Sequence, residues 1–191
     1  MNIFALERNS DGSIDWEASA ESHDTYRTNK MYLESTQMLA TNANFYGFQT
    51  RYRNAHLNHP STIWARESLS NYRNLVNLAG CLRNKFLNYS GKDSHGCDDV
   101  WKKCLELSVF DKDFADKFPT KGDTPLPLCM PDEYKSDDIV ESYRLFFANK
   151  PRLRYVEGSI PRWVYNYRVN TQPIEIVPLN EYNKKYNKNT N

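Results

Sequence analysis

Apolar positions recur at helical spacing along much of this chain, and the longest such pattern covers residues 59–89. At about 100° per residue, one stripe of this segment is apolar and should face a core: Trp64, Tyr72, Leu75, Ala79, Leu82 and Phe86. Asn58 or His59 can cap the first turn, Pro60 suits the position after the cap, and Gly91 stands where a helix should end. The pattern therefore predicts one long helix over residues 59–89.

A second long helix is predicted over residues 24–41, with an apolar side formed by Met31, Tyr32, Met38 and Leu39. Its other side carries a narrow polar arc, spaced by three and four residues: His23, Arg27, Lys30, Glu34, Gln37 and Thr41. Two interpretations of this arc remain open. It can be a solvated face on which Glu34 pairs with Arg27 or Lys30, or it can belong to a site, because acids, bases, imidazoles and amides are the groups that sites use.

The remaining pattern predicts shorter elements. Helices are expected over residues 14–22, 98–107 and 137–149, and a further helical turn is expected over residues 111–118. Ser136 is the expected cap of the last of these helices. Residues 2–6 read as a strand or an extended segment packed on the core.

These elements predict a mainly α fold, a compact helical domain built on two long helices. This domain should span residues 1–165. The Val-, Ile- and Tyr-rich segment at residues 163–177 is expected to contain a strand or two, so the C-terminal extension at residues 166–183 should be short β or extended structure. The polar residues 184–191 are expected to be a disordered tail.

Composition supports a folded chain outside membranes. The chain has 191 residues, of which 14% are aromatic, and no apolar run has the length that a membrane span needs. We also find no leader pattern, and the four cysteines form no CxxC pair, so we expect reduced thiols and a cytoplasmic protein. His95, Cys97 and Cys104 match no standard zinc spacing, and we expect neither a metal nor a cofactor.

Charge is unevenly distributed along the chain, although the net charge is only +1. Residues 26–90 carry eight basic and two acidic side chains, and residues 150–191 carry eight and three. Within the first block, arginines alternate with aromatic residues in the connector at 42–57, as in Arg51, Tyr52 and Arg53. Basic blocks with interleaved aromatics suit an anionic partner such as nucleic acid, although a solvated surface would look similar.

Several patches resemble a family of small bacteriophage proteins. They are MNIF-x-L at the start, KM-x-x-E-x-x-Q-x-L at Lys30–Leu39, NHPSTIWARES-x-x-NY at Asn58–Tyr72, MPDEYK at Met130–Lys135, and VE-x-Y at Val140–Tyr143. Together they touch most of residues 1–165. The resemblance implies a phage protein that acts in the cytoplasm of the host cell.

The helix pattern is also distantly similar to that of the endonuclease V-type pyrimidine-dimer DNA glycosylases, which are small all-helical repair enzymes. The catalytic glutamate of that family falls on Glu34, whereas its Asp and His positions fall on Thr25 and Arg27. That family also uses an N-terminal amine, exposed by removal of Met1, as a nucleophile. Asn2 is too large for efficient removal of Met1, so Lys30 would be the nearest substitute amine.

Three hypotheses follow. The first is a DNA glycosylase or lyase that cleaves an N-glycosidic bond in duplex DNA, possibly damaged or modified, with Glu34 as the catalytic carboxylate. Its other catalytic candidates are Lys30, His23 and His59, and its DNA-binding candidates are Arg27, Gln37, Arg51, Arg53, His56, Arg66 and Arg73. The second is a non-catalytic phage protein that binds DNA or a host protein. The third is an enzyme acting on free nucleotides, and the absence of a phosphate-binding glycine loop argues against it.

Overall fold

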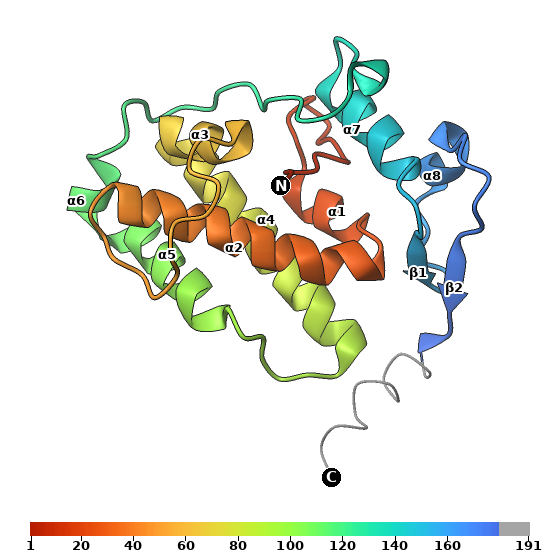
Figure 1. Ribbon diagram of the computed structural model, residues 1–191, viewed down its shortest axis with the longest axis horizontal. Helices are drawn as coiled ribbons and strands as arrows, with labels where there is room; N and C mark the ends of the chain where they lie inside the picture. The colour runs from red at the N-terminus through yellow and green to blue at the C-terminus, as the bar shows by residue number, and fades with distance from the viewer. Residues whose placement is uncertain (180–191) are drawn as a thin grey trace. The chain divides into compact units, whose positions relative to one another are not determined.

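The computed structural model describes residues 1–179, and these residues are mainly helical, as expected (Figure 1). The α-helices are α1 (Trp16–Glu21), α2 (Thr25–Phe45), α3 (Pro60–Glu67), α4 (Leu69–Ser90), α5 (Asp98–Phe110), α6 (Lys112–Ala115), α7 (Ile139–Ala148) and α8 (Arg162–Tyr167). A 3-10 helix, η1, spans Asp132–Tyr134, and two short strands, β1 (Arg154–Val156) and β2 (Glu175–Val177), pair in parallel. The expected tail at residues 184–191 and the end of the expected extension, residues 180–183, lie outside the described residues.

The described residues form two compact units, and each unit draws on three stretches of the chain. Unit 1 contains residues 1–3, 31–80 and 96–129. Unit 2 contains residues 4–30 and 81–95, together with the chain from residue 130 onward. The long helices α2 and α4 each contribute residues to both units.

The expected continuous helix over residues 59–89 is wrong, because the structure divides it into α3 and α4. Ser68 separates the two helices with an extended backbone (φ −145°, ψ 142°). Its hydroxyl donates to the carbonyl of Gly122 and accepts from the backbone N–H of Ser70 at 3.1 Å. The backbone N–H of Leu69 donates to the carbonyl of Thr120 at 3.1 Å. A contact with residues 120–122 therefore replaces one turn of helix.

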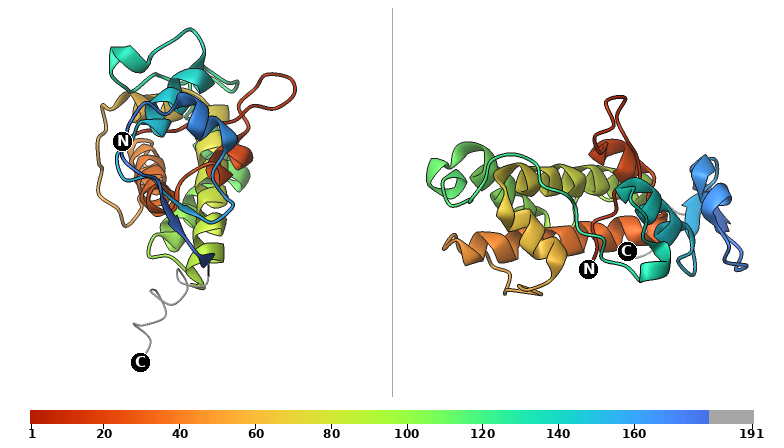
Figure 2. Two further views of the ribbon diagram at one scale, coloured as in Figure 1. Left: turned by 90° about the vertical axis from the view of Figure 1, so that its right-hand side faces the viewer. Right: turned by 90° about the horizontal axis from the view of Figure 1, so that it is seen from above.

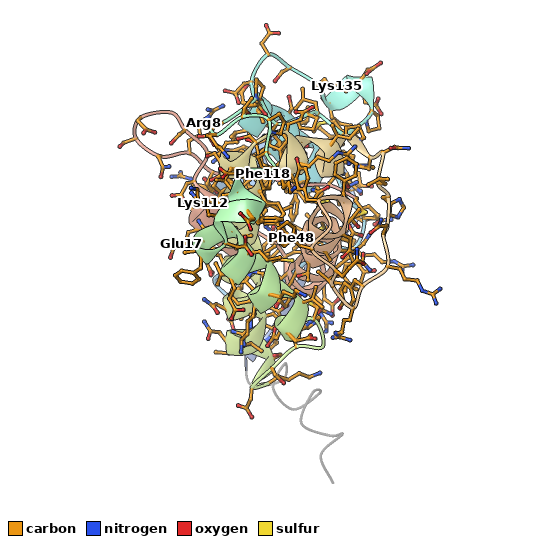
Figure 3. The ribbon with its side chains drawn as sticks, turned by 90° about the vertical axis from the view of Figure 1, so that its left-hand side faces the viewer. Arg8, Glu17, Phe48, Lys112, Phe118 and Lys135 are labelled. Atoms are coloured by element: carbon orange, nitrogen blue, oxygen red, sulfur yellow. The ribbon has the colours of Figure 1, made fainter. Side chains whose placement is uncertain are left out.

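Unit 1 is packed around the N-terminal half of α4. The six residues of the predicted apolar stripe are all buried, and those of unit 1 are Trp64, Tyr72, Leu75 and Ala79. Near α6 a group of aromatic rings packs edge to face, and Figure 3 labels two of its members, Phe48 and Phe118. Residues 119–129 follow α6 in the chain and contain no helix or strand (Figure 2). The carbonyl of Thr124 accepts from the Trp64 indole at 3.0 Å, which ties this segment to α3.

Unit 2 contains α1, α7, α8 and the two strands. The apolar N-terminal segment is buried as expected, with Phe4 4% exposed and Leu6 fully buried. The expected Ser136 cap of α7 is wrong, because Asp138 is the cap and accepts from the N–H of Glu141 at 2.9 Å. The segment at residues 163–177 is only partly a strand, since it begins within α8 and contains β2 alone.

Candidate functional site

Glu34 and His59 are neighbours in unit 1. Glu34 lies on α2 and is partly exposed, and His59 caps the first turn of α3. Burial lowers the pKa of His59, and among the charged groups that act on the imidazole the Glu34 carboxylate works in the opposite direction. Two helices that are separate in the sequence therefore bring a carboxylate and an imidazole to one place.

The capping role of His59 fixes its tautomer. Its Nδ1 accepts from the backbone N–H of Ser61 at 3.2 Å, so in the neutral ring the proton resides on Nε2. Burial is the largest influence on the His59 pKa and lowers it, and the positive charges of the Met1 amino group and His56 lower it further, against the opposing effect of Glu34. At neutral pH the imidazole is therefore uncharged and presents Nε2–H as a hydrogen-bond donor.

The same neighbourhood contains a backbone amine and a second imidazole. The Met1 amino group and His56 both act electrostatically on His59, and all of these residues belong to unit 1. Met1 and Asn2 are partly buried, and the Asn2 carboxamide oxygen is buried without a hydrogen-bond partner among the described residues. His56 is exposed and adopts a left-handed backbone conformation with φ of 52°. We call Met1, Glu34, His56 and His59 the N-terminal cluster.

The basic residues predicted to contact DNA in unit 1 differ in their availability. Arg53 is exposed, and Gln37 is partly exposed on α2. Arg51 is also exposed but forms a bidentate ion pair with Asp99, at 2.6 Å and 2.8 Å, and donates to the carbonyl of Gly96. The structure thus commits the Arg51 guanidinium to a surface contact with α5.

Arg66 and Arg73 both bind backbone carbonyls. The Arg66 guanidinium donates to the carbonyl of Leu57 at 2.6 Å and lies 4.9 Å from the centroid of the Phe45 ring, which is 52% exposed. The Arg73 guanidinium donates twice to the carbonyl of Ser108, near the end of α5. Of these two arginines, Arg66 forms an exposed cation–aromatic pair of the kind that can contact a base or a phosphate.

His23 and Arg27 have structural positions in unit 2. The His23 imidazole is 1% exposed, lies against the rings of Phe4 and Phe147, and donates from Nδ1 to the carbonyl of Ser19 at 2.7 Å. Arg27 is 8% exposed and forms a 2.9 Å ion pair with the buried Asp24. Neither side chain is available to a bound substrate in this conformation.

Lys30 and Thr25 are the remaining residues of α2 that the similarity to the glycosylases singles out. Lys30 is exposed and precedes Glu34 by one turn of α2. Thr25, at the Asp position of the glycosylase pattern, is buried and donates from its hydroxyl to the carbonyl of Arg154 at 3.0 Å. Its role in this chain is therefore to hold β1 beside α2.

Two lysine amines of unit 2 have lowered pKa values that the sequence did not predict. Burial lowers the pKa of Lys85 to about 8, and its amine donates to the carbonyls of Glu21 and His23 at the end of α1. Burial likewise lowers the pKa of Lys150 to about 8, and the charges of Arg27 and Lys30 lower it further. No spacing pattern along the chain marks either lysine, because their neighbours come from distant segments.

Comparison with known proteins adds no relative. No family model, no curated protein and no solved structure matches this chain. Within residues 1–179, no group of three or more His, Cys, Asp or Glu side chains is placed to hold a metal ion. No helix in the same range has the length and apolar character needed to cross a membrane.

Proposed function

We propose that this chain is a nucleic-acid-acting enzyme of the DNA glycosylase or lyase type, with Glu34 as its catalytic carboxylate. Its substrate is duplex DNA with a damaged or modified base, in the cytoplasm of a phage-infected cell. The observation that carries the proposal is the electrostatic influence of the Glu34 carboxylate on His59, an imidazole on which the Met1 amino group also acts. The similarity of the helix pattern to that of the glycosylases, in which Glu34 falls on the catalytic glutamate, agrees with this assignment.

The chemistry of base release requires a carboxylate of this kind. Breaking an N-glycosidic bond develops positive charge on the sugar, and a nearby carboxylate stabilises that charge or activates the attacking water. Glu34 is partly exposed, so its carboxylate can reach a bound nucleotide. A single well-placed charge of this type contributes several kcal/mol to transition-state stabilisation, on the order of 10²–10³ in rate.

His59 has a supporting role in this scheme. Its neutral Nε2–H can donate a hydrogen bond to the substrate, since Nδ1 is held by the Ser61 backbone. Two amines are candidates for a covalent imine with the opened sugar, the amino group of residue 1 and the Lys30 side chain.

The replacement Glu34→Gln tests the proposal. It keeps the shape of the side chain and removes its charge, so we expect base release to fall by at least about a hundredfold while DNA affinity changes only a few-fold. Base release is measured on ultraviolet-irradiated, uracil-containing and alkylated duplexes under single-turnover conditions. Glu67→Gln, at an exposed glutamate of α3, is the matched control and should keep full activity. Wild-type protein that binds these duplexes and releases no base would exclude the enzyme for those lesions.

Borohydride trapping identifies the amine. If an imine forms, reduction links the DNA to the protein, and peptide mapping shows whether residue 1 or Lys30 carries the adduct. Lys30→Ala should abolish trapping if Lys30 carries the adduct, and it should leave trapping intact if residue 1 carries it. Release of base without trapping would assign direct attack by water.

A specific observation favours a second function, a non-catalytic phage protein that binds DNA or a host protein. The Asp and His positions of the glycosylase pattern are occupied by Thr25 and Arg27, and both side chains are buried in structural contacts. This alternative predicts DNA affinity that is equal in wild type and Glu34→Gln, together with no base release from any duplex tested.

A further inference from the structure

The outer edge of β1 is covered by other parts of unit 2. β1 and β2 form a two-stranded parallel sheet (Figure 1), so each strand has one edge that faces away from the other. On the outer edge of β1, the backbone N–H of Arg154 donates to the Asp24 carboxylate at 3.1 Å, and the Arg154 carbonyl accepts from the Thr25 hydroxyl at 3.0 Å. The carbonyl of Val156 accepts from the N–H of Ser159 at 3.0 Å. The chain itself therefore satisfies this edge.

The outer edge of β2 is open. The N–H of Glu175 donates to the carbonyl of Leu153 at 2.9 Å, and the carbonyl of Val177 accepts from the N–H of Glu157 at 3.1 Å. These two residues direct their backbone groups at β1, and the direction alternates along a strand, so the N–H and carbonyl of Ile176 point away from β1. Within residues 1–179 they have no hydrogen-bond partner, and the Ile176 side chain is 55% exposed.

The sequence of β2 does little to protect this edge. Proteins shield open edges with lysines, with prolines inside the strand, or by covering the edge. Pro173 and Pro178 flank β2 without entering it, and the only charged residue between them is Glu175. The Glu175 carboxylate is paired with Arg154 at 3.1 Å, and Leu179, just beyond the strand, is 53% exposed. The open edge is therefore short, apolar and close to neutral.

We infer that the open edge of β2 binds β2 of a second copy of this chain, in antiparallel orientation, to form a four-stranded sheet across a two-fold axis. A two-fold interface between identical edges requires the two strands to run in opposite directions. With Ile176 on the axis, its two copies exchange N–H···O hydrogen bonds and place their side chains next to each other on one face of the sheet.

The charges and the prolines of β2 favour the register centred on Ile176. In this register Glu175 lies opposite Val177 of the second copy, so like charges are not opposed. The N–H of Ile174 donates to the carbonyl of Pro178, and the missing N–H of this proline falls at the end of the ladder, where water reaches. A centre at Glu175 would oppose two carboxylates, and a centre at Val177 would place the Ile176 carbonyl opposite Pro178, without a donor. This match of the edge to itself selects a second copy as the partner.

Replacement of Ile176 by proline tests the interface. Proline removes the N–H that points outward and keeps the hydrogen bonds between β1 and β2. Sedimentation equilibrium of the full wild-type chain should show a monomer–dimer equilibrium, and Ile176→Pro should weaken it at least about tenfold, because each copy loses a donor. Ile176→Lys, which opposes two like charges, should have a similar effect. The matched control is Val109→Lys, at a β-branched side chain of α5 that is 50% exposed, and it should associate as wild type does.

Cysteine cross-linking tests the register. Residues that exchange hydrogen bonds across antiparallel strands have Cα atoms about 5.5 Å apart, which a disulfide can span. Ile176→Cys should therefore give a disulfide-linked dimer with oxidised glutathione. Glu175→Cys, which would face Val177 of the second copy, should cross-link much more slowly. Wild type, with its four native cysteines, gives the background.

Several results would overturn the inference. They are a chain that stays monomeric at every concentration, a dimer that survives in Ile176→Pro and Ile176→Lys, and equal cross-linking of the two cysteine variants. Loss of the dimer in Val109→Lys alone would assign the interface to α5, and an open edge that binds only unrelated extended peptides would assign it to another protein. Circular dichroism and thermal unfolding establish that each variant is folded. If Ile176→Pro does not fold, Ile176→Lys and the cross-linking decide.

Discussion

The His23 imidazole has one satisfied and one unsatisfied nitrogen. Nδ1 donates to the carbonyl of Ser19, and Nε2 is buried without a partner among the residues described. Burial lowers the pKa of His23 to about 3, and the positive charges of Lys85 and Arg27 add to this effect. Because burial against Phe4 and Phe147 disfavours the charged ring, His23 ties the stability of the chain to pH.

Acidification should therefore destabilise the protein through His23. The unfolded chain binds a proton near pH 6.5 and the folded chain only near pH 3, so stability is present above pH 6.5 and is lost as the pH falls towards 3. Between pH 7 and pH 5 we expect this residue alone to lower the free energy of unfolding by about 2 kcal/mol. Denaturant unfolding at the two pH values measures the loss.

One variant isolates the contribution of His23. In His23→Asn the protein will be less stable at both pH values, but the difference between them should shrink by about that amount. An unchanged pH dependence in His23→Asn would contradict the assignment.

At the scale of elements, α4 and α5 approach each other closely at Gly80. A Cβ atom added to Gly80 would lie 2.8 Å from the Trp101 ring, too close for any real contact. The Trp101 indole also donates to the carbonyl of Val76 at 3.1 Å, which holds the ring in this place. A residue that usually weakens a helix is therefore required inside α4.

Gly80→Ala should destabilise unit 1. Alanine gains up to about 1 kcal/mol of helix propensity, but overpacking against Trp101 costs about 1–3 kcal/mol, and we expect the second effect to dominate. Thermal unfolding measures the result. Adding Trp101→Phe should recover part of the loss, and Gly122→Ala, where a Cβ meets nothing within 4 Å, is the control. A more stable Gly80→Ala protein would show that α5 can shift at no cost.

Elements with strong periodicity could be predicted, and breaks in them could not. The apolar stripe from Trp64 to Phe86 is buried as the spacing predicts, because burial follows helical period. The break at Ser68 depends on a contact with residues 120–122, more than fifty positions away, and local pattern carries no information about it. For α7, the expected cap was Ser136, whereas the helix begins at Ile139 and Asp138 caps it.

The candidate site divides in the same way. Periodicity placed Lys30, Glu34 and Gln37 on one side of α2, and the three side chains are exposed or partly exposed. The same arc included His23, Arg27 and Thr41, which other segments cover. The N-terminal cluster and Lys150 could not be foreseen, since each depends on residues brought together by tertiary structure.

At the scale of the whole molecule, more basic side chains bind other groups of the protein than the composition suggests. Many basic side chains of residues 26–90 bind backbone carbonyls or buried acids, namely Arg27, Arg51, Arg66, Arg73 and Lys85. Such contacts keep the charge in place and, except for Arg66 with its exposed Phe45 partner, limit the contacts that the side chain can make with a phosphate. Fewer cations of residues 26–90 therefore remain to release counterions from DNA.

Binding of duplex DNA should accordingly show a moderate dependence on salt. We expect the slope of log K against log salt to lie between about −2 and −4 over 50–200 mM KCl, corresponding to a few phosphate contacts. Fluorescence anisotropy with a labelled duplex measures it. A slope steeper than about −6 would mean that the carbonyl contacts open on binding, and a slope near zero would remove the electrostatic basis of a nucleic-acid partner.

The interleaving of the two units has a consequence for synthesis on the ribosome. Unit 1 uses no residue after Cys129, whereas unit 2 needs α7, β1 and β2. A nascent chain can therefore complete unit 1 while the apolar residues of Phe4–Leu6 and the end of α4 still await their partners. A translational pause after residue 129 would prolong this exposure and favour capture by chaperones. The speed of elongation over the last third of the message thus becomes part of how the protein reaches its fold.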